Sequence, residues 1–219
     1  MASRLMHLAV SQRLEKVLPI KNVNDFRVGQ ILPDAVMSAD KTEVNSHFIK
    51  VFGGGKRKVF DFLAFYDRYE REILYDELYL GYYFHLIEDN LFRLLLYYDL
   101  GLLARRGDPK LLEELYRDYH ILNGIIAEKY LIDSDLQIPQ GFSDMTLNEI
   151  YSFEIGEFIR DMKADFNERI SGKPKYFTAE VLDKFISKSV KVCSEEYSSL
   201  KQGGHSIDLY GMSIENKHI

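Results

Sequence analysis

The chain of 219 residues has no tryptophan, a single cysteine and only five prolines. The lone Cys193 excludes an internal disulfide, which fits a reducing compartment. A membrane-spanning helix needs about 18 consecutive apolar residues, and no stretch of the sequence approaches that length. Arg4, His7 and Arg13 interrupt the apolar N-terminal residues, which therefore do not form the core of a signal peptide. We expect a cytoplasmic protein without a transmembrane segment.

An excess of positive charge is absent as well. Asp and Glu total 34 against 28 Lys and Arg, which gives a formal net charge of -6. General nucleic-acid binders usually carry a basic face, so we expect no stable nucleic-acid complex. The 15 Tyr and 14 Phe must supply most of the large core side chains. Aromatic residues left at the surface would favour a homodimer.

Helical periodicity is the strongest pattern that the sequence does contain. Apolar spacing and cap residues predict an all-α, single-domain bundle of about seven helices. This metal-binding helical domain is expected over residues 1–202, followed by a loose C-terminal tail over 203–219. Short extended pieces are expected only near residues 48–60. The expected helices lie in 3–17, 24–40 (a short helix and then a turn), 62–71, 75–98, 109–131, 152–169 and 178–201.

The segment GYYFHLIED, residues 81–89, lies in the most apolar of these helices. His85 and Asp89 are four residues apart, so a helix presents an imidazole nitrogen and a carboxylate oxygen on one face, within reach of one metal ion. An uncompensated aspartate is costly in such a helix. The alternative is a satisfied core pair in which His85 donates a hydrogen bond to Asp89. Gly81, one turn earlier, lets a ligand or another backbone come close.

Three further residues are candidates for the same site. His7 interrupts the apolar face of the first helix, Asp34 follows a proline in a turn, and His47 lies in a loop. Taken singly, each has an ordinary alternative: a core or surface histidine, a turn residue and a solvated histidine. With His85 and Asp89 they form a set of mixed nitrogen and oxygen donors. Such a set suits a divalent metal, zinc first and also iron or manganese.

The order of these residues resembles that of the helical zinc-dependent phospholipases C and the related fungal single-strand nucleases. Members carry an early His, a Pro-Asp turn, a loop His and a helical His-x-x-x-Asp. The corresponding segments here read MHLA from residue 6, GQILPD from residue 29, SHF from residue 46 and HLIED from residue 85. The resemblance covers about the first 100 residues and implies a phospholipase C-like helical fold.

The resemblance also implies roles for the five residues. Asp34, His47, His85 and Asp89 would hold one metal ion, and Asp89 would bridge to a second ion held by His7. The family binds a further ion through later histidines and a His-x-x-x-Glu motif. No histidine after residue 89 begins that motif in this sequence. The resemblance therefore implies a mononuclear or dinuclear site.

The segment RDYHILN, residues 117–123, resembles a segment of short bacterial family members of unassigned function. By that resemblance, Asp118 and His120 could complete a reduced site, and Asn123 could orient a ligand or substrate. The alternative is an ordinary polar helix face.

The loop GGGKRK, residues 53–58, follows His47 closely. It is not a Walker A loop, because no Gly-Lys-Ser or Gly-Lys-Thr ends it. It is either a flexible solvated loop or a mobile basic rim that attracts phosphate.

If the site is catalytic, we expect hydrolysis of a small phosphoester by metal-activated water. Asp34, placed in a turn rather than a helix, is the expected ligand and catalytic proton acceptor. A non-catalytic helical scaffold with a structural or degenerate metal site is the alternative. A helical phosphohydrolase of the HD type ranks last, because it needs an adjacent His-Asp pair that the sequence lacks.

Overall fold

The structure, a computed structural model, describes residues 1–36, 43–151 and 153–216. Within these ranges it contains seven α-helices of seven residues or more, the single-turn helix α3 and a three-stranded sheet. None of these helices is both long and apolar enough to cross a membrane. The protein is mostly helical, as expected, but the sheet makes the all-α expectation wrong in part. The elements are α1 (Arg4–Leu14), α2 (Val23–Gly29), η1 (Leu32–Asp34), α3 (Glu43–Ser46), β1 (Ile49–Phe52), β2 (Arg57–Phe60), α4 (Phe62–Tyr75), α5 (Glu77–Leu94), η3 (Leu95–Asp99), η4 (Leu103–Arg105), α6 (Pro109–Tyr130), η5 (Phe142–Asp144), η6 (Thr146–Glu149), α7 (Ile155–Asp165), α8 (Ala179–Leu200) and β3 (Ile214–Glu215).

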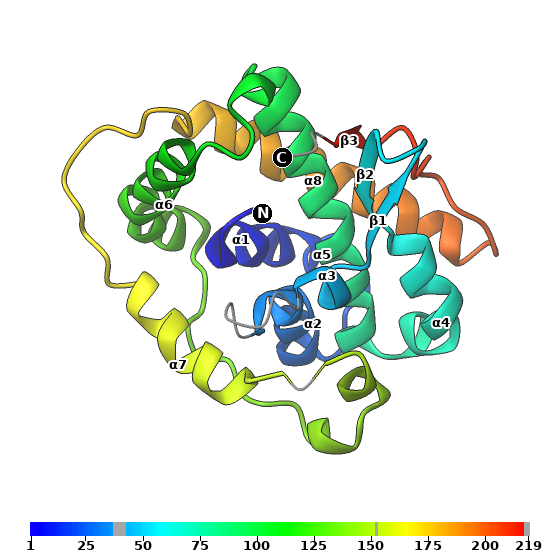
Figure 1. Cartoon of the computed structure of the whole chain (residues 1–219). Helices are drawn as coiled ribbons and strands as arrows, with labels where there is room; N and C mark the ends of the chain where they lie inside the picture. Colours follow the sequence, from blue (N-terminus) through cyan, green and yellow to red (C-terminus); the bar gives the residue numbers. More distant parts are fainter. Residues whose placement is uncertain (37–42, 152, 217–219) are drawn as a thin grey trace.

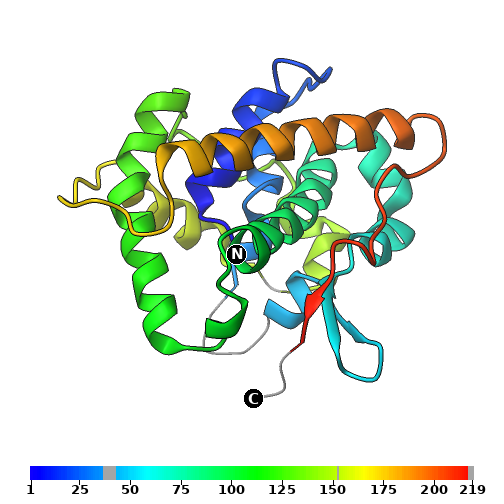
Figure 2. The ribbon, with the colours of Figure 1, turned by 90° about the horizontal axis from the view of Figure 1, so that it is seen from above.

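Helix α5 runs through the centre of the molecule (Figure 1). Every residue from Leu78 to Arg93 is buried. Helices α1, α2, α4 and α8 pack against it, so its apolar side chains find partners on all sides. Figure 2 shows the long helix α8 lying across α1 and α5. The expected central buried helix is confirmed, and the π-helical turn η3 prolongs it.

Two glycines set the distance between α2 and α5. A Cβ atom on Gly81 would lie 2.3 Å from the carbonyl oxygen of Phe26, and one on Gly29 would lie 2.1 Å from that of Leu78. No side chain fits at either position, so the two helix backbones touch. Of the two expectations for Gly81, the structure shows the approach of another backbone. This contact places the turn that follows α2 beside the middle of α5.

Four helices begin at a polar residue whose side chain caps the first turn. In each of four helices, a side-chain oxygen of the N-cap residue accepts a hydrogen bond from a backbone N–H of the first turn. The four N-caps are Ser3, Asp61, Asp108 and Thr178.

Two helices are shorter than expected. Helix α2 ends at Gly29, because Pro33 favours the tight turn η1 over a continued helix. Helix α7 covers only Ile155–Asp165, and the chain after it turns to bring Glu168 against α6. The expected start of this helix, Ser152, and residues 37–40 of the 24–40 prediction lie outside the described residues.

The extended pieces near residues 48–60 form a hairpin in which Ile49 lies opposite Phe60. All three residues of the turn 53–55 are glycines with positive φ, a conformation that glycine adopts readily. The side chain of Asn90 on α5 accepts from the Phe60 N–H at 3.0 Å and donates to its carbonyl at 2.8 Å. The expected loop at residues 53–58 is therefore a turn followed by a strand that is fixed to α5. In that strand, Arg57 donates a hydrogen bond to the Ser213 hydroxyl.

The C-terminal segment is not the loose tail that its polar sequence suggested. Ile214 is buried and, with Glu215, forms β3, which pairs with β2. Glu196 of α8 is buried and accepts hydrogen bonds from His205 Nδ1 and from the Ser206 N–H, each at 2.8 Å. A polar segment packs here because a buried carboxylate satisfies its donors.

Substitution of Gly81 by alanine should destabilise the protein, because its Cβ would meet backbone that cannot move independently. We expect a loss of about 1–3 kcal/mol or more in the free energy of unfolding, measured by urea denaturation. Gly156→Ala in α7 is the matched control, because its Cβ would meet only Ile138 Cδ1 at 3.5 Å. That variant should gain stability, as alanine usually does in a helix. Equal stability of Gly81→Ala and the wild type would contradict the backbone contact.

Candidate metal centre

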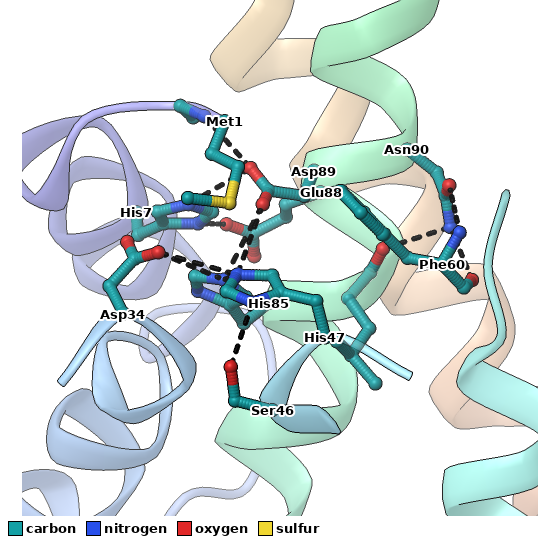
Figure 3. Close-up of polar contacts among 12 residues, drawn as sticks. Met1, His7, Asp34, Ser46, His47, Phe60, His85, Glu88, Asp89 and Asn90 are labelled. Carbon is teal, nitrogen blue, oxygen red and sulfur yellow. Dashed lines mark hydrogen bonds and ion pairs between the residues drawn. The ribbon is translucent and has the colours of Figure 1, made fainter. Parts of the chain in front are cut away.

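Five candidate residues converge beside the middle of α5 (Figure 3). His85 and Asp89 come from α5, His7 from α1, Asp34 from the turn η1, and His47 from the junction between α3 and β1. All but Asp34 are fully buried, and the Asp34 side chain is 12% exposed. The fold therefore brings together residues that lie as far apart in the sequence as His7 and Asp89.

Four donor atoms, from Asp34, His47, His85 and Asp89, lie close to one another. His47 Nε2 lies 3.2 Å from His85 Nε2 and 3.3 Å from Asp34 Oδ1, and the His85 Nε2–Asp34 Oδ1 distance is 3.9 Å. Asp89 Oδ2 is 3.6 Å from both imidazole nitrogens. A tetrahedral zinc ion with ligands at about 2.0–2.1 Å separates them by about 3.4 Å. These five separations are close to that value. The donors form two groups of three whose ligand atoms all lie within 4.8 Å of one another: Asp34, His47 and His85, and His7, His85 and Asp89.

The second oxygen of Asp89 faces His7. Asp89 Oδ1 lies 3.4 Å from His7 Nε2 and accepts a hydrogen bond from the Ala2 N–H at 2.8 Å. The His7 ring stacks on the His85 ring with centroids 4.1 Å apart. Asp89 thus lies between two donor groups, one containing His47 and His85 and the other containing His7. This is the position that a bridging carboxylate requires.

The other ring nitrogens of the histidines have fixed partners. His7 Nδ1 lies 2.7 Å from Glu88 Oε2, and His85 Nδ1 lies 2.8 Å from the Gln30 carbonyl oxygen. Both oxygens accept only, so each Nδ1 carries a hydrogen and Nε2 faces the centre. His47 Nδ1 lies 3.0 Å from the Ser46 hydroxyl. Metal-binding histidines are commonly oriented in this way by an outer carboxylate or carbonyl.

Several polar atoms at the centre are buried without a hydrogen bond. Among the described residues, His7 Nε2, Asp34 Oδ1 and Asp89 Oδ2 have no such partner. A buried polar atom left in this state costs about 1–3 kcal/mol. The carboxylates of Asp34 and Asp89 also place negative charge in the core that a bound cation would offset. A divalent cation at this point would satisfy both requirements, so the residues present fit a metal ion.

The electrostatics of the cluster favour ligands in their binding forms. Burial raises the pKa of Asp89, but the close approach of His7, whose Nε2 lies 3.4 Å from Oδ1, holds it well below its usual range. Burial and the charge of His7 lower the pKa of His85 to about 3. Burial by itself lowers the pKa of His7, but Asp89 and Glu88 raise it to about 10. His85 is therefore neutral at pH 7, whereas a cation must displace a proton from His7.

Glu88 is the site residue that the sequence reasoning missed. It is fully buried, burial raises its pKa, and its partner is His7. A second carboxylate next to Asp89, three residues after His85, was the available signal. Two acids in the centre of an apolar helix need two partners, whereas the sequence reasoning assigned only one.

Asp118 is not near the centre. Its two carboxylate oxygens accept hydrogen bonds from three consecutive backbone N–H groups before α8, those of Lys175, Tyr176 and Phe177. It anchors that segment to α6, so the idea that it completes the metal site is wrong. His120 Nδ1 and Asn123 Nδ2 instead bind Glu168, at 2.7 and 2.8 Å.

A cavity of about 350 Å³ adjoins the centre. The N-terminal residues, η1, α6, α7 and the end of the central helix line it, and Asp34 belongs to its wall. His120 and Asn123 also line it, so they share a space with Asp34 without lying among the donor atoms. Asp34 is thus the one residue of the centre that borders the cavity.

Comparison of the chain with models of protein families, with curated proteins and with solved structures found no match. The likeness to zinc-dependent phospholipases C therefore depends on the quoted residues alone.

Removal of a central ligand should abolish metal binding. We expect the wild type to retain one or two equivalents of zinc by elemental analysis after dialysis, and His85→Ala to retain much less. His205→Ala is the control, because His205 lies away from the cluster and pairs with Glu196. Equal zinc content in His85→Ala and the wild type would rule out this centre.

Without metal, the free energy of unfolding should fall on the alkaline side. The folded pKa of His7 is about 10, above its ordinary 6.5. Its stabilising contribution is complete below about pH 6.5 and is lost as pH rises toward 10. We expect urea denaturation in chelator to show a decline between about pH 7 and pH 9.5 that is smaller in His7→Gln. An equal decline in both proteins would show that His7 is not protonated in the folded state.

Proposed function

We propose that this protein is a metal-dependent hydrolase of phosphoesters. The observation that carries the proposal is the position of Asp34, which contributes a donor atom to the four-atom set and also borders a cavity. A purely structural metal is normally closed off from ligand space, whereas a catalytic metal is adjacent to it. The order of the ligands in the sequence, which resembles that of the zinc-dependent phospholipases C, supports the same function.

Asp34, His47, His85 and Asp89 would hold one ion, and His7 with the other Asp89 oxygen would hold a second. Zinc suits the mixed nitrogen and oxygen donors best, with iron or manganese as alternatives. A bound divalent ion supplies a Lewis acid that lowers the pKa of water and offsets charge on phosphoryl oxygens.

The protein's own groups then have separate roles. Glu88 and the Gln30 carbonyl orient the rings of His7 and His85. Asp34 is ionised at neutral pH, because the imidazoles of His85 and His47 hold its pKa below the usual value against the opposing effect of burial. Its place in the turn η1, with 12% of the side chain exposed, allows it to accept a proton from water on the cavity side.

A second candidate function is a non-catalytic scaffold with a structural metal. The observation that favours it is that Asp89 Oδ2 lies 3.6 Å from the His47 and His85 nitrogens that are grouped with Asp34, so protein atoms could supply all four ligands of a zinc ion. The two candidate functions differ in one respect. In the hydrolase, water or substrate would take a coordination position at the metal, whereas in the scaffold Asp34 would keep that position.

The proposal also covers the substrate, the cellular compartment and the oligomeric state. We propose a small phosphoester as its substrate. A single, buried Cys193 suits a compartment that keeps thiols reduced, such as the cytoplasm. Exposed aromatic side chains such as Tyr75 and Tyr210 offer surface for a homodimer.

The zinc-loaded protein should hydrolyse members of a panel of phosphate monoesters and diesters, including 4-nitrophenyl phosphate and bis(4-nitrophenyl) phosphate. Asp34→Asn should lower kcat by roughly a hundredfold or more, since it loses the proton acceptor. Asp161→Asn, an exposed position in α7, should have wild-type activity. If the wild type holds its full zinc content but hydrolyses no member of the panel, the hydrolase proposal is wrong. That outcome would favour the scaffold with a structural metal.

A further inference from the structure

His47 is the one histidine of the centre that no long helix carries. It lies between the single-turn helix α3 and strand β1, whereas His7 and His85 belong to α1 and α5. A connecting segment is more mobile than the elements that it joins, unless neighbouring elements hold it. The position of this ligand therefore depends on contacts from outside its own segment.

The residue after His47 has a strained backbone. Phe48 has a φ of 48°, in the left-handed region that a bulky residue rarely adopts. Such strain persists only where the surrounding structure maintains it, and it is found mainly at functional sites. If those contacts were lost, the peptide between His47 and Phe48 would relax and carry the imidazole away from His85 and Asp89.

The hydroxyl of Tyr82 on α5 contacts this segment. It donates a hydrogen bond to the Ser46 carbonyl oxygen at 2.5 Å, and both residues are fully buried. Ser46 ends α3, and the carbonyl groups at the end of a helix need partners from outside it. The Ser46 hydroxyl lies 3.0 Å from His47 Nδ1 (Figure 3). One tyrosine thus fixes the residue that contacts the ring of His47.

Aromatic packing fixes the Tyr82 ring. It stacks on the Phe65 ring of α4 with centroids 4.5 Å apart and planes 5° from parallel. Phe65 also packs edge-to-face on Phe48, with centroids 5.4 Å apart, so one ring contacts both the tyrosine and the strained residue. The Phe48 carbonyl oxygen accepts a hydrogen bond from the Asp61 N–H at 2.8 Å. The segment is therefore held on both sides of His47, through Ser46 and through Phe48.

We infer that Tyr82 is a positioning residue of the metal centre, whose hydroxyl holds His47 in its ligand position against the strain at Phe48. It acts through Ser46 and contributes no donor atom itself. Burial raises the pKa of the Tyr82 hydroxyl well above its usual value, so the group remains a donor at neutral pH. Helix α5 then supplies two ligands, His85 and Asp89, and the group that holds a third. The inference rests on the metal ion of the proposed function but not on hydrolysis.

Tyr82→Phe tests this role, because it removes one oxygen atom and keeps the stacked ring. Zinc affinity is measured by competition with a chromophoric chelator, and cobalt(II) in place of zinc reports the ligand geometry through its visible absorption. We expect zinc to bind at least about tenfold more weakly and the cobalt spectrum to change, as for other residues that orient metal ligands. Unchanged affinity and spectrum in folded Tyr82→Phe would overturn the inference, even if the variant unfolds at a lower temperature.

Tyr79→Phe is the matched control on the same helix. The Tyr79 hydroxyl forms a hydrogen bond with Thr146 Oγ1, at 2.9 Å, and not with the segment that carries His47. This variant also loses one hydroxyl and one hydrogen bond, but it should keep the zinc affinity and the cobalt spectrum of the wild type. Equal changes in Tyr79→Phe and Tyr82→Phe would show a general effect on the fold and would overturn the inference.

The strain at Phe48 provides a second test. Asparagine and leucine side chains have nearly the same shape, but asparagine adopts positive φ far more readily. In a Phe48→Asn background the strain is smaller, so we expect Tyr82→Phe to weaken zinc binding only about twofold. In a Phe48→Leu background the loss should stay at about tenfold. Equal losses in the two backgrounds would overturn the part assigned to strain, and the comparison in the wild-type background needs neither variant.

These results are independent of hydrolysis. If zinc binds more weakly to Tyr82→Phe and the wild type hydrolyses no ester, the inference stands and the hydrolase proposal fails. If Tyr82→Phe keeps the zinc affinity and cobalt spectrum of an active wild type, the inference fails and the hydrolase proposal stands. Absence of zinc binding by the wild type would overturn both.

Discussion

The contact between α2 and α5 at Gly29 and Gly81 determines where the polar cluster can form. Because the two backbones touch, the carbonyl of Gln30 reaches His85 Nδ1 at 2.8 Å and fixes the orientation of that ring. The same contact positions the turn η1, so Asp34 Oδ1 faces the Nε2 atoms of the histidines. A separation larger by one methyl group would lengthen all of these distances together. The site is therefore a consequence of helix packing as much as of the ligands themselves.

Charge in the core is the second constraint. Asp89 lies on a helix whose neighbours are apolar, and an isolated carboxylate there would cost several kcal/mol. Several groups offset the negative charge of Asp89. His7 and the Ala2 N–H lie against one carboxylate oxygen, and His47 and His85 face the other. Glu88 in turn holds His7. His7 comes from α1 and His47 from the junction before β1, so the cluster links these elements to α5.

Much of this arrangement could be predicted from the sequence because its signals are local. A capping side chain such as Ser3 or Thr178 acts within one turn, and the four-residue spacing of His85 and Asp89 fixes their shared face. The gathering of His7, Asp34 and His47 was inferred from their donor types and their order, together with a resemblance, since no local pattern connects residues so far apart. The misreading of Asp118 has the same cause. The resemblance of the segment 117–123 suggested a role in the site, but the partners of Asp118 lie almost 60 residues later, before α8.

The C-terminal strand shows the limit of reasoning from composition. Residues 203–216 are polar and rich in turn formers, which is typical of a loose end, yet β3 pairs with β2 and Glu196 holds His205. The partners that order this segment are a strand about 155 residues earlier and a buried acid on another helix. The sequence of residues 203–216 by itself predicts neither the pairing of β3 with β2 nor the contact with the buried Glu196.

The order of the elements along the chain has a consequence for how the centre is filled. All five donor residues lie within the first 89 residues, whereas α6 and α8, which cover α1 in the folded molecule, are made last. During synthesis at roughly 5–20 residues per second, the ligand set leaves the ribosome several seconds before the helices that enclose it. An ion can therefore enter while the core is still open, and the completed fold does not need a path for it. On the proposed function, an ion could therefore be taken up during synthesis, before the later helices enclose the centre.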